Sequence, residues 1–221
     1  MGHSLGEYGA LVGAGALSFA DALEAVSARG QGMAQVEVDD NGTMAAILGL
    51  ELETLESLCA EASEGEEKVA PANENGGGQV VVAGHAGAVK RLRDLAKANK
   101  GRAIPLRVSA PFHCGLMQPA ADRLEAALAE VDVHPMRAPV IANVDAEPND
   151  DPSRVKALLV QQVTGRVRWE ASVRKAVHMG VTRGLEVGHG KVLTGLVKRI
   201  DKSLTVTPVG SPDDIGVLSR A

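Results

Sequence analysis

The stretch Gly2-His3-Ser4-Leu5-Gly6 constrains the fold of this chain more than any other part of the sequence. It fits the pattern G-x-S-x-G, the sharp turn between a buried strand and a helix that lifts a serine out of a sheet as a nucleophile. Such a turn predicts an α/β protein. Only three residues precede Ser4, whereas a typical strand takes about five. We therefore expect the sheet to be incomplete at the N-terminus of this sequence.

Helical and strand patterns alternate along the rest of the chain. Helices are predicted over residues 5–13 and 18–33, and Ser18 and Asp21 form a capping-box pattern at the start of the second. Residues 42–109 follow the order strand, helix, strand, strand, helix, strand, which is typical of ferredoxin-like units. The later elements predicted are a helix over 117–131, a strand over 138–144, helices over 152–163 and 169–180, a strand over 181–187, a helix over 191–201 and a strand over 204–209.

This alternation favours a parallel sheet covered by helices on both faces. We therefore predict an α/β-hydrolase-like parallel-sheet subdomain made of residues 1–38 and 110–221. A ferredoxin-like βαββαβ subdomain of residues 39–109 is predicted as an insertion into it.

Composition excludes several classes of function. The chain of 221 residues has a formal net charge of −5 and only 2% aromatic residues. Nucleic-acid binding is therefore not expected, because it needs a basic face and stacking platforms. The two cysteines lack the spacing of a metal site or a disulfide framework. No signal peptide opens the sequence, and no apolar run approaches the roughly 20 residues that cross a bilayer. A cytoplasmic protein without a membrane segment or a bound metal is predicted.

Three polar residues occur in patterns that suit catalysis. Ser4 has a glycine two residues to each side, and these glycines remove side chains that would clash in a strained turn. His113 directly follows a predicted strand, where an imidazole can take the proton of a serine hydroxyl and later deliver it to a leaving group. Arg29 lies at the edge of the apolar stripe of its helix, so it requires an anionic partner. The alternatives are a bound carboxylate, a surface salt bridge with Asp21, and an arginine that merely lies at a helix end.

Several motifs in one order resemble a known family. They are GHSLGEY at 2–8, SARGQGM at 27–33, NENGGGQVVVAG at 73–84, APFHCGLM at 110–117, ANVD at 142–145 and EVGHGKVLTGL at 186–196. This set is similar to the malonyl-CoA:acyl carrier protein transacylase family, the acyltransferases that load fatty acid and polyketide synthesis. The resemblance spans essentially the whole chain. It departs at His189, where the family usually has proline.

The resemblance implies a role for each residue of the catalytic group. Ser4 takes the acyl group, and His113 is the base that removes the serine proton. The main-chain carbonyl of Gln162 orients the histidine in place of an Asp or Glu, so the Gln162 side chain is expected to tolerate change with modest effect. The backbone N–H of Leu5 supplies one donor to the oxyanion.

The same resemblance implies roles in substrate binding. Arg29 binds the free carboxylate of a malonyl group through its planar fork of donors. Phe112 leaves little room for an extra methyl group and so favours malonyl over methylmalonyl, although core packing is an equal alternative. Asn73, or Asn75, lines the cleft from the small subdomain unless that stretch is a plain turn.

The implied activity is that of an [acyl-carrier-protein] S-malonyltransferase in fatty acid biosynthesis. Malonyl-CoA and the phosphopantetheinyl carrier protein are substrates, and no cofactor is needed. Basic residues are candidates for docking an acidic carrier protein, namely Lys100 and Arg102 in the small subdomain and Lys191, Lys198 and Arg199 in the last clear helix. The alternative is that they only form a solvated helix face. The family implies a monomer if the chain is complete.

The resemblance also implies that a segment is missing before Ser4. Members of the family have a GQGSQ-like motif there, whose glutamine completes the oxyanion hole, and the loss of one such donor typically costs about 100- to 1,000-fold in rate. We therefore expect this chain alone to be weak or inactive and to expose a sheet edge that promotes association. Two alternatives stay open: a serine hydrolase or thioesterase with the same turn, and a non-catalytic fragment that only binds the carrier protein or CoA.

Overall fold

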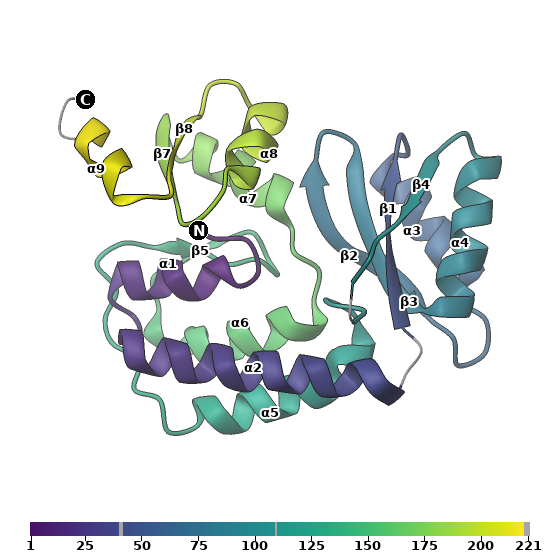
Figure 1. The fold of residues 1–221 in the computed structure, drawn as a ribbon, viewed down its shortest axis with the longest axis horizontal. Helices are drawn as coiled ribbons and strands as arrows, with labels where there is room; N and C mark the ends of the chain where they lie inside the picture. Colours follow the sequence, from purple (N-terminus) through teal and green to yellow (C-terminus); the bar gives the residue numbers. More distant parts are fainter. Residues whose placement is uncertain (40–41, 109, 219–221) are drawn as a thin grey trace.

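A computed structural model of this protein describes residues 1–39, 42–108 and 110–218, so residue 109, at the second predicted boundary, lies outside the described residues. The chain is a mixed α/β protein, and Figure 1 shows two groups of elements side by side. The first group contains β1 (Gly42–Leu48), α3 (Leu52–Ala62), β2 (Val69–Gly76), β3 (Gln79–His85), α4 (Ala86–Ala98) and β4 (Arg102–Pro105). The second group contains α1 (Gly6–Ala14), α2 (Phe19–Asp39), η1 (Gly115–Met117), α5 (Gln118–Leu128), β5 (Val140–Ile141), β6 (Pro148–Asn149), α6 (Pro152–Thr164), α7 (Trp169–His178), β7 (Arg183–Val187), α8 (Val192–Ile200), β8 (Thr205–Val209) and α9 (Pro212–Leu218).

Strands β1 to β4 form one antiparallel sheet in the order β2-β3-β1-β4. Alternate residues of a strand point to opposite faces. In β1, Ala45 and Ile47 pack into a core that α3 and α4 also line, whereas Met44 and Ala46 belong to a core on the other side that includes Cys114. Both faces are therefore buried, which explains the nearly continuous apolar run of this strand. The order of elements from β1 to β4 is the one predicted from the sequence.

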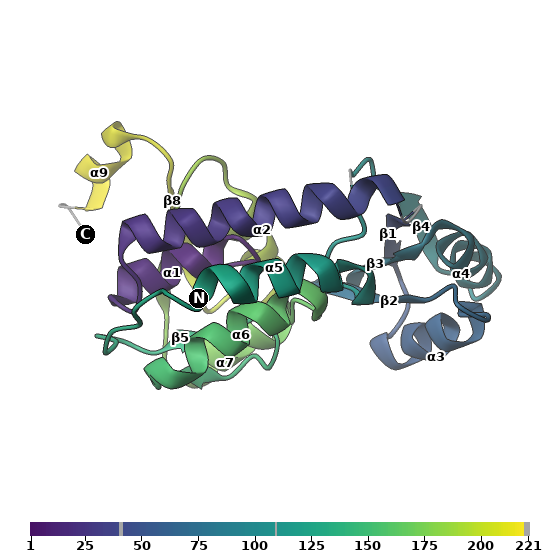
Figure 2. The ribbon, with the colours of Figure 1, turned by 90° about the horizontal axis from the view of Figure 1, so that it is seen from below.

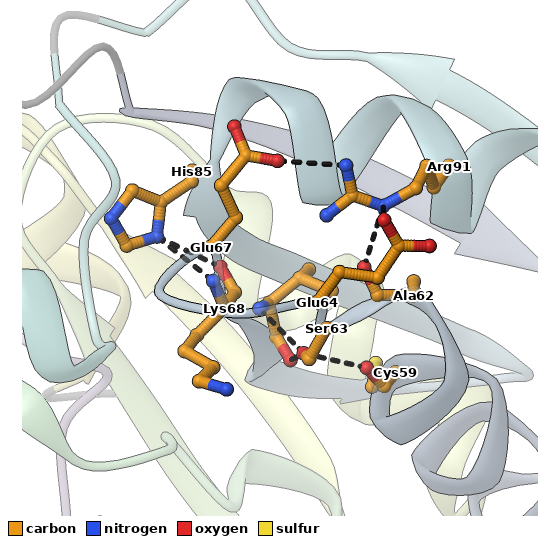
Figure 3. A network of polar contacts seen from close by, with 9 residues as sticks. Cys59, Ala62, Ser63, Glu64, Glu67, Lys68, His85 and Arg91 are labelled. Atoms are coloured by element: carbon orange, nitrogen blue, oxygen red, sulfur yellow. Dashed lines mark hydrogen bonds and ion pairs between the residues drawn. The ribbon is translucent and has the colours of Figure 1, made fainter.

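A polar network fixes the segment that leads into β2 (Figure 3). Arg91 of α4 donates from Nε to the Ala62 carbonyl at 2.9 Å and from Nη1 to the Glu67 carboxylate at 2.7 Å. The Lys68 N–H donates to Nδ1 of His85 at 3.0 Å. These bonds tie the loop between α3 and β2 to α4 and to the end of β3, and so they set the position at which β2 starts.

The helices α1, α2, α5 and α6 pack around a separate core of mainly aliphatic side chains. Figure 2 shows α2 and α5 lying side by side. Before α2, the hydroxyl of Ser18 accepts the Asp21 N–H at 3.0 Å, so the predicted cap is present. In the described residues, no helix combines the length and apolar character needed to cross a membrane.

Helix α2 is longer than predicted. It continues to Asp39, whereas the apolar stripe indicated an end near Met33. Val36 is still buried in the core, and Arg123 of α5 donates to the Gln35 side chain at 3.0 Å. Packing against α5 therefore extends the helix past the point where its own pattern weakens.

The predicted parallel sheet of the second group is present only in part. In the described residues, β7 and β8 form a parallel pair, while β5 and β6 form a separate antiparallel pair of two residues each. The strand predicted over 138–144 is this short because Asn143 makes other bonds. Its N–H donates to the Glu7 carboxylate at 3.0 Å, and its carbonyl accepts the Arg168 N–H at 2.9 Å. Strand β6 and helix α9 have no counterpart among the predicted elements.

Residues of β5 and β7 line an apolar cavity of about 350 Å³ that also contains Met1, Trp169 and Val206 in its wall. Nearby apolar side chains are exposed, including Leu185 at 52% and Val187 at 80%. Strand β7 pairs only with β8 in the described part of the chain. Exposed apolar residues on a strand with an unpaired edge favour association.

We expect Val187→Lys to raise the concentration at which the chain self-associates, because a charge on β7 opposes edge-to-edge pairing. Sedimentation velocity over a concentration series measures this change. Phe19→Lys is the matched control, since Phe19 is 74% exposed but lies on α2. An equal shift with both variants would contradict association through β7.

Candidate active site

The turn at residues 2–6 has the strained geometry that a nucleophile elbow requires. Ser4 has a φ of 49°, in the left-handed region that side chains rarely adopt. A Cβ on Gly2 would lie 2.0 Å from the Gly6 carbonyl oxygen, so only glycine fits there. A Cβ on Gly6 would meet nothing within 4 Å. The expectation that both glycines avoid clashes through their own missing side chains is therefore wrong for Gly6, whose backbone is what Gly2 must accommodate.

Asn143 pairs with this turn in the way a neighbouring strand would. Its side-chain Oδ1 accepts the Ser4 N–H at 2.6 Å, and its Nδ2 donates to the Gly2 carbonyl at 2.7 Å. Buried backbone groups need such partners. One amide thus satisfies the backbone on both sides of His3 and fixes the direction in which Ser4 points.

Ser4, His113 and Gln162 form a hydrogen-bonded chain. The Ser4 Oγ lies 2.8 Å from Nε2 of His113, and Nδ1 of His113 lies 2.9 Å from the Gln162 main-chain oxygen. Since a carbonyl can only accept, Nδ1 carries the proton and Nε2 is free to accept the serine proton. Burial lowers the pKa of His113 to about 4, so the imidazole is neutral at pH 7. The arrangement suits a general base.

Arg29 reaches the same point from α2 and is only 7% exposed. Its Nη2 donates to Ser4 Oγ at 2.8 Å and lies 3.4 Å from the Gln162 Oε1, and its guanidinium lies 5.9 Å from the centre of the Tyr8 ring. Burial lowers the pKa of the guanidinium. Among the described residues no carboxylate forms an ion pair with it, and Asp21 instead bonds Ser18. A buried, unpaired cation favours an incoming anion.

These side chains open into one cavity of about 470 Å³ between the two groups of elements. The polar residues of its wall are His3, Ser4, Arg29, Asn73 and His113. The apolar part of the wall is made by Met33, Met44, Val81, Leu106, Val108 and Phe112, among others. The cavity thus brings together five of the seven predicted site residues. Gln162 is fully buried behind His113, and Leu5 is outside the wall.

Strand β2 closes the cavity from the side of the small sheet. Its backbone pairs with Val167, because the Glu74 N–H donates to the Val167 carbonyl at 2.9 Å and the Val167 N–H donates to the Ala72 carbonyl at 2.8 Å. Asn73 lies between these bonds and faces the cavity, whereas the Asn75 side chain lies 3.0 Å from Nε2 of His3. The choice between the two asparagines therefore falls on Asn73 as the cavity residue.

The sequence pattern missed two residues of this site. Glu7 and Asn143 lie inside the motifs GHSLGEY and ANVD, but nothing in the sequence indicates that they meet. The main-chain carbonyl of Gln162 does contact His113, as the resemblance implies. Its side chain, which is expected to tolerate change with modest effect, has hydrogen-bond partners of its own. Its Nε2 donates to the Ser4 carbonyl at 3.1 Å and to the Glu7 carboxylate at 2.7 Å.

The remaining predicted residues lie apart from this cavity. The five basic docking candidates are exposed, and Arg199 of α8 packs against Gly77, in the turn between β2 and β3. His189 is exposed in the loop before α8. Within the described ranges, no three His, Cys, Asp or Glu side chains gather in a way that could hold a metal ion.

Comparison with known proteins matches nearly the whole chain to one family. Residues 1–218 match the family described as acyl transferase domain. The malonyl CoA-acyl carrier protein transacylase of Escherichia coli (strain K12) is 45% identical over 212 residues, which are 96% of this chain and 68% of that protein. The likeness therefore extends over nearly the whole chain, as the motifs predicted.

Solved structures agree with this match. The acyl-carrier-protein-S-malonyltransferase of Bartonella henselae has a TM-score of 0.93 at 44% identity, covering 99% of this chain and 69% of that one. A malonyl-transacylase in complex with its type II PKS acyl-carrier protein has a TM-score of 0.92 at 40% identity, covering 99% and 71%.

The buried histidine predicts an unusual pH dependence of Ser4 reactivity. A base with a pKa of about 4 stays unprotonated far below the ordinary value of 6.5. The rate at which an uncharged fluorophosphonate labels Ser4 should therefore stay level from about pH 8 down to about pH 5 and then fall. Initial rates by intact-protein mass spectrometry measure this, with circular dichroism to verify folding at each pH. An acid limb centred near 6.5 would contradict it.

The two glycines of the elbow should differ sharply on substitution. We expect Gly2→Ala to destabilise the fold by at least about 2 kcal/mol, because its Cβ overlaps backbone that cannot move freely, and to abolish labelling of Ser4. Gly6→Ala, whose Cβ meets open space, is the control and should retain both. Thermal melts and the labelling rate decide the matter, and similar losses in both variants would count against this account of the turn.

Proposed function

Because this chain belongs to the acyl transferase domain family, we propose that it transfers a malonyl group from malonyl-CoA to the phosphopantetheine thiol of an acyl carrier protein in fatty acid biosynthesis. One observation carries this proposal: the buried Arg29 without a carboxylate partner beside the Ser4–His113 pair. The similar proteins, a malonyl CoA-acyl carrier protein transacylase and an acyl-carrier-protein-S-malonyltransferase among them, support the same substrates.

In the first step Ser4 becomes acylated. His113 Nε2 takes the hydroxyl proton while Oγ attacks the thioester carbonyl of malonyl-CoA. The Leu5 N–H, which has no acceptor in the described residues, donates to the oxygen that becomes negative. The carbon–sulfur bond then breaks, and His113 returns the proton to the CoA thiolate. The Gln162 carbonyl stabilises the imidazolium through Nδ1 during the transfer.

The second step runs the same chemistry in reverse order. His113 removes the proton of the carrier protein's thiol, and the thiolate attacks the carbonyl carbon of malonyl-Ser4. The ester bond breaks, and the Ser4 oxygen recovers its proton from His113. Both steps need one base that shuttles a proton, so no cofactor or metal is required.

Arg29 selects the acyl group in this proposal. Its Nη2 lies 2.8 Å from Ser4 Oγ. In a malonyl ester of Ser4, a single methylene group separates the ester carbonyl from the free carboxylate. The guanidinium is therefore within reach of that carboxylate. Phe112, half-buried in the cavity wall, narrows the space for a branched acyl group, and Asn73 borders the cavity from β2.

We also propose the two-part division of residues 1–38 with 110–221 and of residues 39–109, with a ferredoxin-like small part. Its support is the single antiparallel sheet of β1 to β4 and the separate helical core. The proposal also includes a cytoplasmic location, a monomeric state for a complete chain, and docking of an acidic carrier protein on the exposed basic residues.

The hydrolase alternative is disfavoured by Arg29, because an apolar acyl groove would not contain a buried cation. The non-catalytic alternative is disfavoured by the intact hydrogen bonds from Ser4 to Gln162. Free malonate released at one rate with and without carrier protein would favour the hydrolase. Absence of any malonyl adduct on Ser4 would favour the fragment.

We expect Arg29→Gln to lower kcat/KM for malonyl-CoA by about 10- to 100-fold, because it removes charge-assisted hydrogen bonds worth roughly 1.5–3 kcal/mol. Transfer from acetyl-CoA, which lacks the carboxylate, should not fall. Radiolabelled transfer to carrier protein measures both, with Ser4→Ala as the background. Arg123→Gln, on the exposed side of α5, is the matched control. An unchanged preference for malonyl in Arg29→Gln would contradict the assignment.

A further inference from the structure

Glu7 is a buried carboxyl group that the proposed chemistry does not use. It lies in the first turn of α1, three residues after the nucleophile, and is only 2% exposed. One of its oxygens, Oε2, accepts two hydrogen bonds, from the Asn143 N–H at 3.0 Å and from the Gln162 Nε2 at 2.7 Å. Burying a carboxyl group costs free energy unless it is hydrogen-bonded, and both bonds to Glu7 come from residues that contact the site.

The first donor leads to Ser4. The Asn143 main chain is held by Glu7, and its side chain then accepts the Ser4 N–H and donates to the Gly2 carbonyl. The Glu7 oxygen therefore sets the position of the Asn143 side-chain amide, which holds the strained Ser4 backbone.

The second donor leads to His113 and Arg29. The Gln162 amide group has a nitrogen with two donors and an oxygen that only accepts. Its nitrogen faces two acceptors, the Glu7 Oε2 and the Ser4 carbonyl, so its oxygen must face Arg29. This orientation presents an acceptor to the guanidinium. With the side chain anchored, the Gln162 carbonyl stays in place for Nδ1 of His113.

We propose that Glu7 is a positioning residue: through Asn143 and Gln162, its carboxyl oxygen aligns Ser4, His113 and Arg29 with one another. Any effect of Glu7 on the rate of malonyl transfer rests on the function proposed above. The alignment of the three side chains does not, because it exists without substrate. Among the described residues, no other single atom accepts hydrogen bonds from both Asn143 and Gln162.

The role requires an acceptor of the right length and not a negative charge. Burial raises the pKa of Glu7 to about 7, while its bonds from Gln162 and Asn143 and the N-terminal amine oppose this rise and Asp145 adds to it. The protonated acid still has a carbonyl oxygen that accepts. Glutamine at this position has the same acceptor at the same reach, whereas aspartate keeps the charge and is one methylene too short to meet both donors.

The test combines a spectroscopic signal with a rate. In protein labelled with ¹⁵N-histidine, the Nδ1 proton of His113 gives a signal protected from water by its bond to Gln162, assigned by its loss in His113→Gln. Fluorophosphonate labelling of Ser4 measures reactivity without needing a malonyl group. The variants are Glu7→Gln, Glu7→Asp and Glu7→Leu. Leu11→Ala is the control, a buried core residue on the same helix whose side chain cannot accept a hydrogen bond from either donor.

We expect Glu7→Gln to keep the His113 signal and a labelling rate within about 3-fold of the native chain. Glu7→Asp and Glu7→Leu should lose the protected signal and label roughly 100-fold more slowly, as expected of a misaligned nucleophile. Leu11→Ala should melt earlier yet keep both. If Glu7→Leu does not fold, the contrast between Gln and Asp decides alone.

Three results would overturn the positioning role: an unchanged signal and rate in Glu7→Asp and Glu7→Leu, a loss in Glu7→Gln equal to theirs, or an equal loss in Leu11→Ala. Failure of the proposed function is distinguishable, because it appears as absent malonyl transfer in the native chain while the His113 signal still responds to Glu7.

Discussion

The strained conformation of Ser4 is the constraint on which the rest of the site depends. A positive φ at a serine persists only where the surroundings hold it. Here the surroundings are specific: Gly2 leaves room for the Gly6 carbonyl, and the Asn143 side chain holds the backbone on both sides of His3. His113 shares this strain with a φ of 60°. The two reacting side chains meet because both backbones are held in conformations they would not adopt alone.

Burial of charge around this pair links stability to specificity. Arg29 loses its hydration in the cavity wall. Its contacts with Ser4, Gln162 and the Tyr8 ring replace only part of the lost interaction with water. Such a cation is a poor contributor to stability and a strong site for a carboxylate. Burial also keeps His113 neutral and therefore ready to accept a proton. In the proposed function, the same desolvation therefore prepares His113 as the base and favours an anionic substrate at Arg29.

The cavity exists only because the two groups of elements are joined along β2. The backbone of this strand pairs with Val167, and Asn75 meets His3 of the elbow. At its other end, the Arg91 network holds the loop that leads into the strand. The elbow and the small sheet therefore enclose the cavity together, and neither forms it alone.

The sequence by itself determined the elbow and the order of elements from β1 to β4. Through its resemblance to a family, it also indicated Ser4, His113, Arg29 and Gln162 as candidate site residues, which the structure brings together. These are carried by local patterns and contiguous motifs. Only the tertiary structure decided the length of α2, the interruption of β5 at Asn143, the choice of Asn73 over Asn75 and the positions of Glu7 and the Gln162 side chain. The physical reason is that a buried hydrogen bond joins residues more than a hundred positions apart, so its partners carry no pattern that neighbouring residues could reveal.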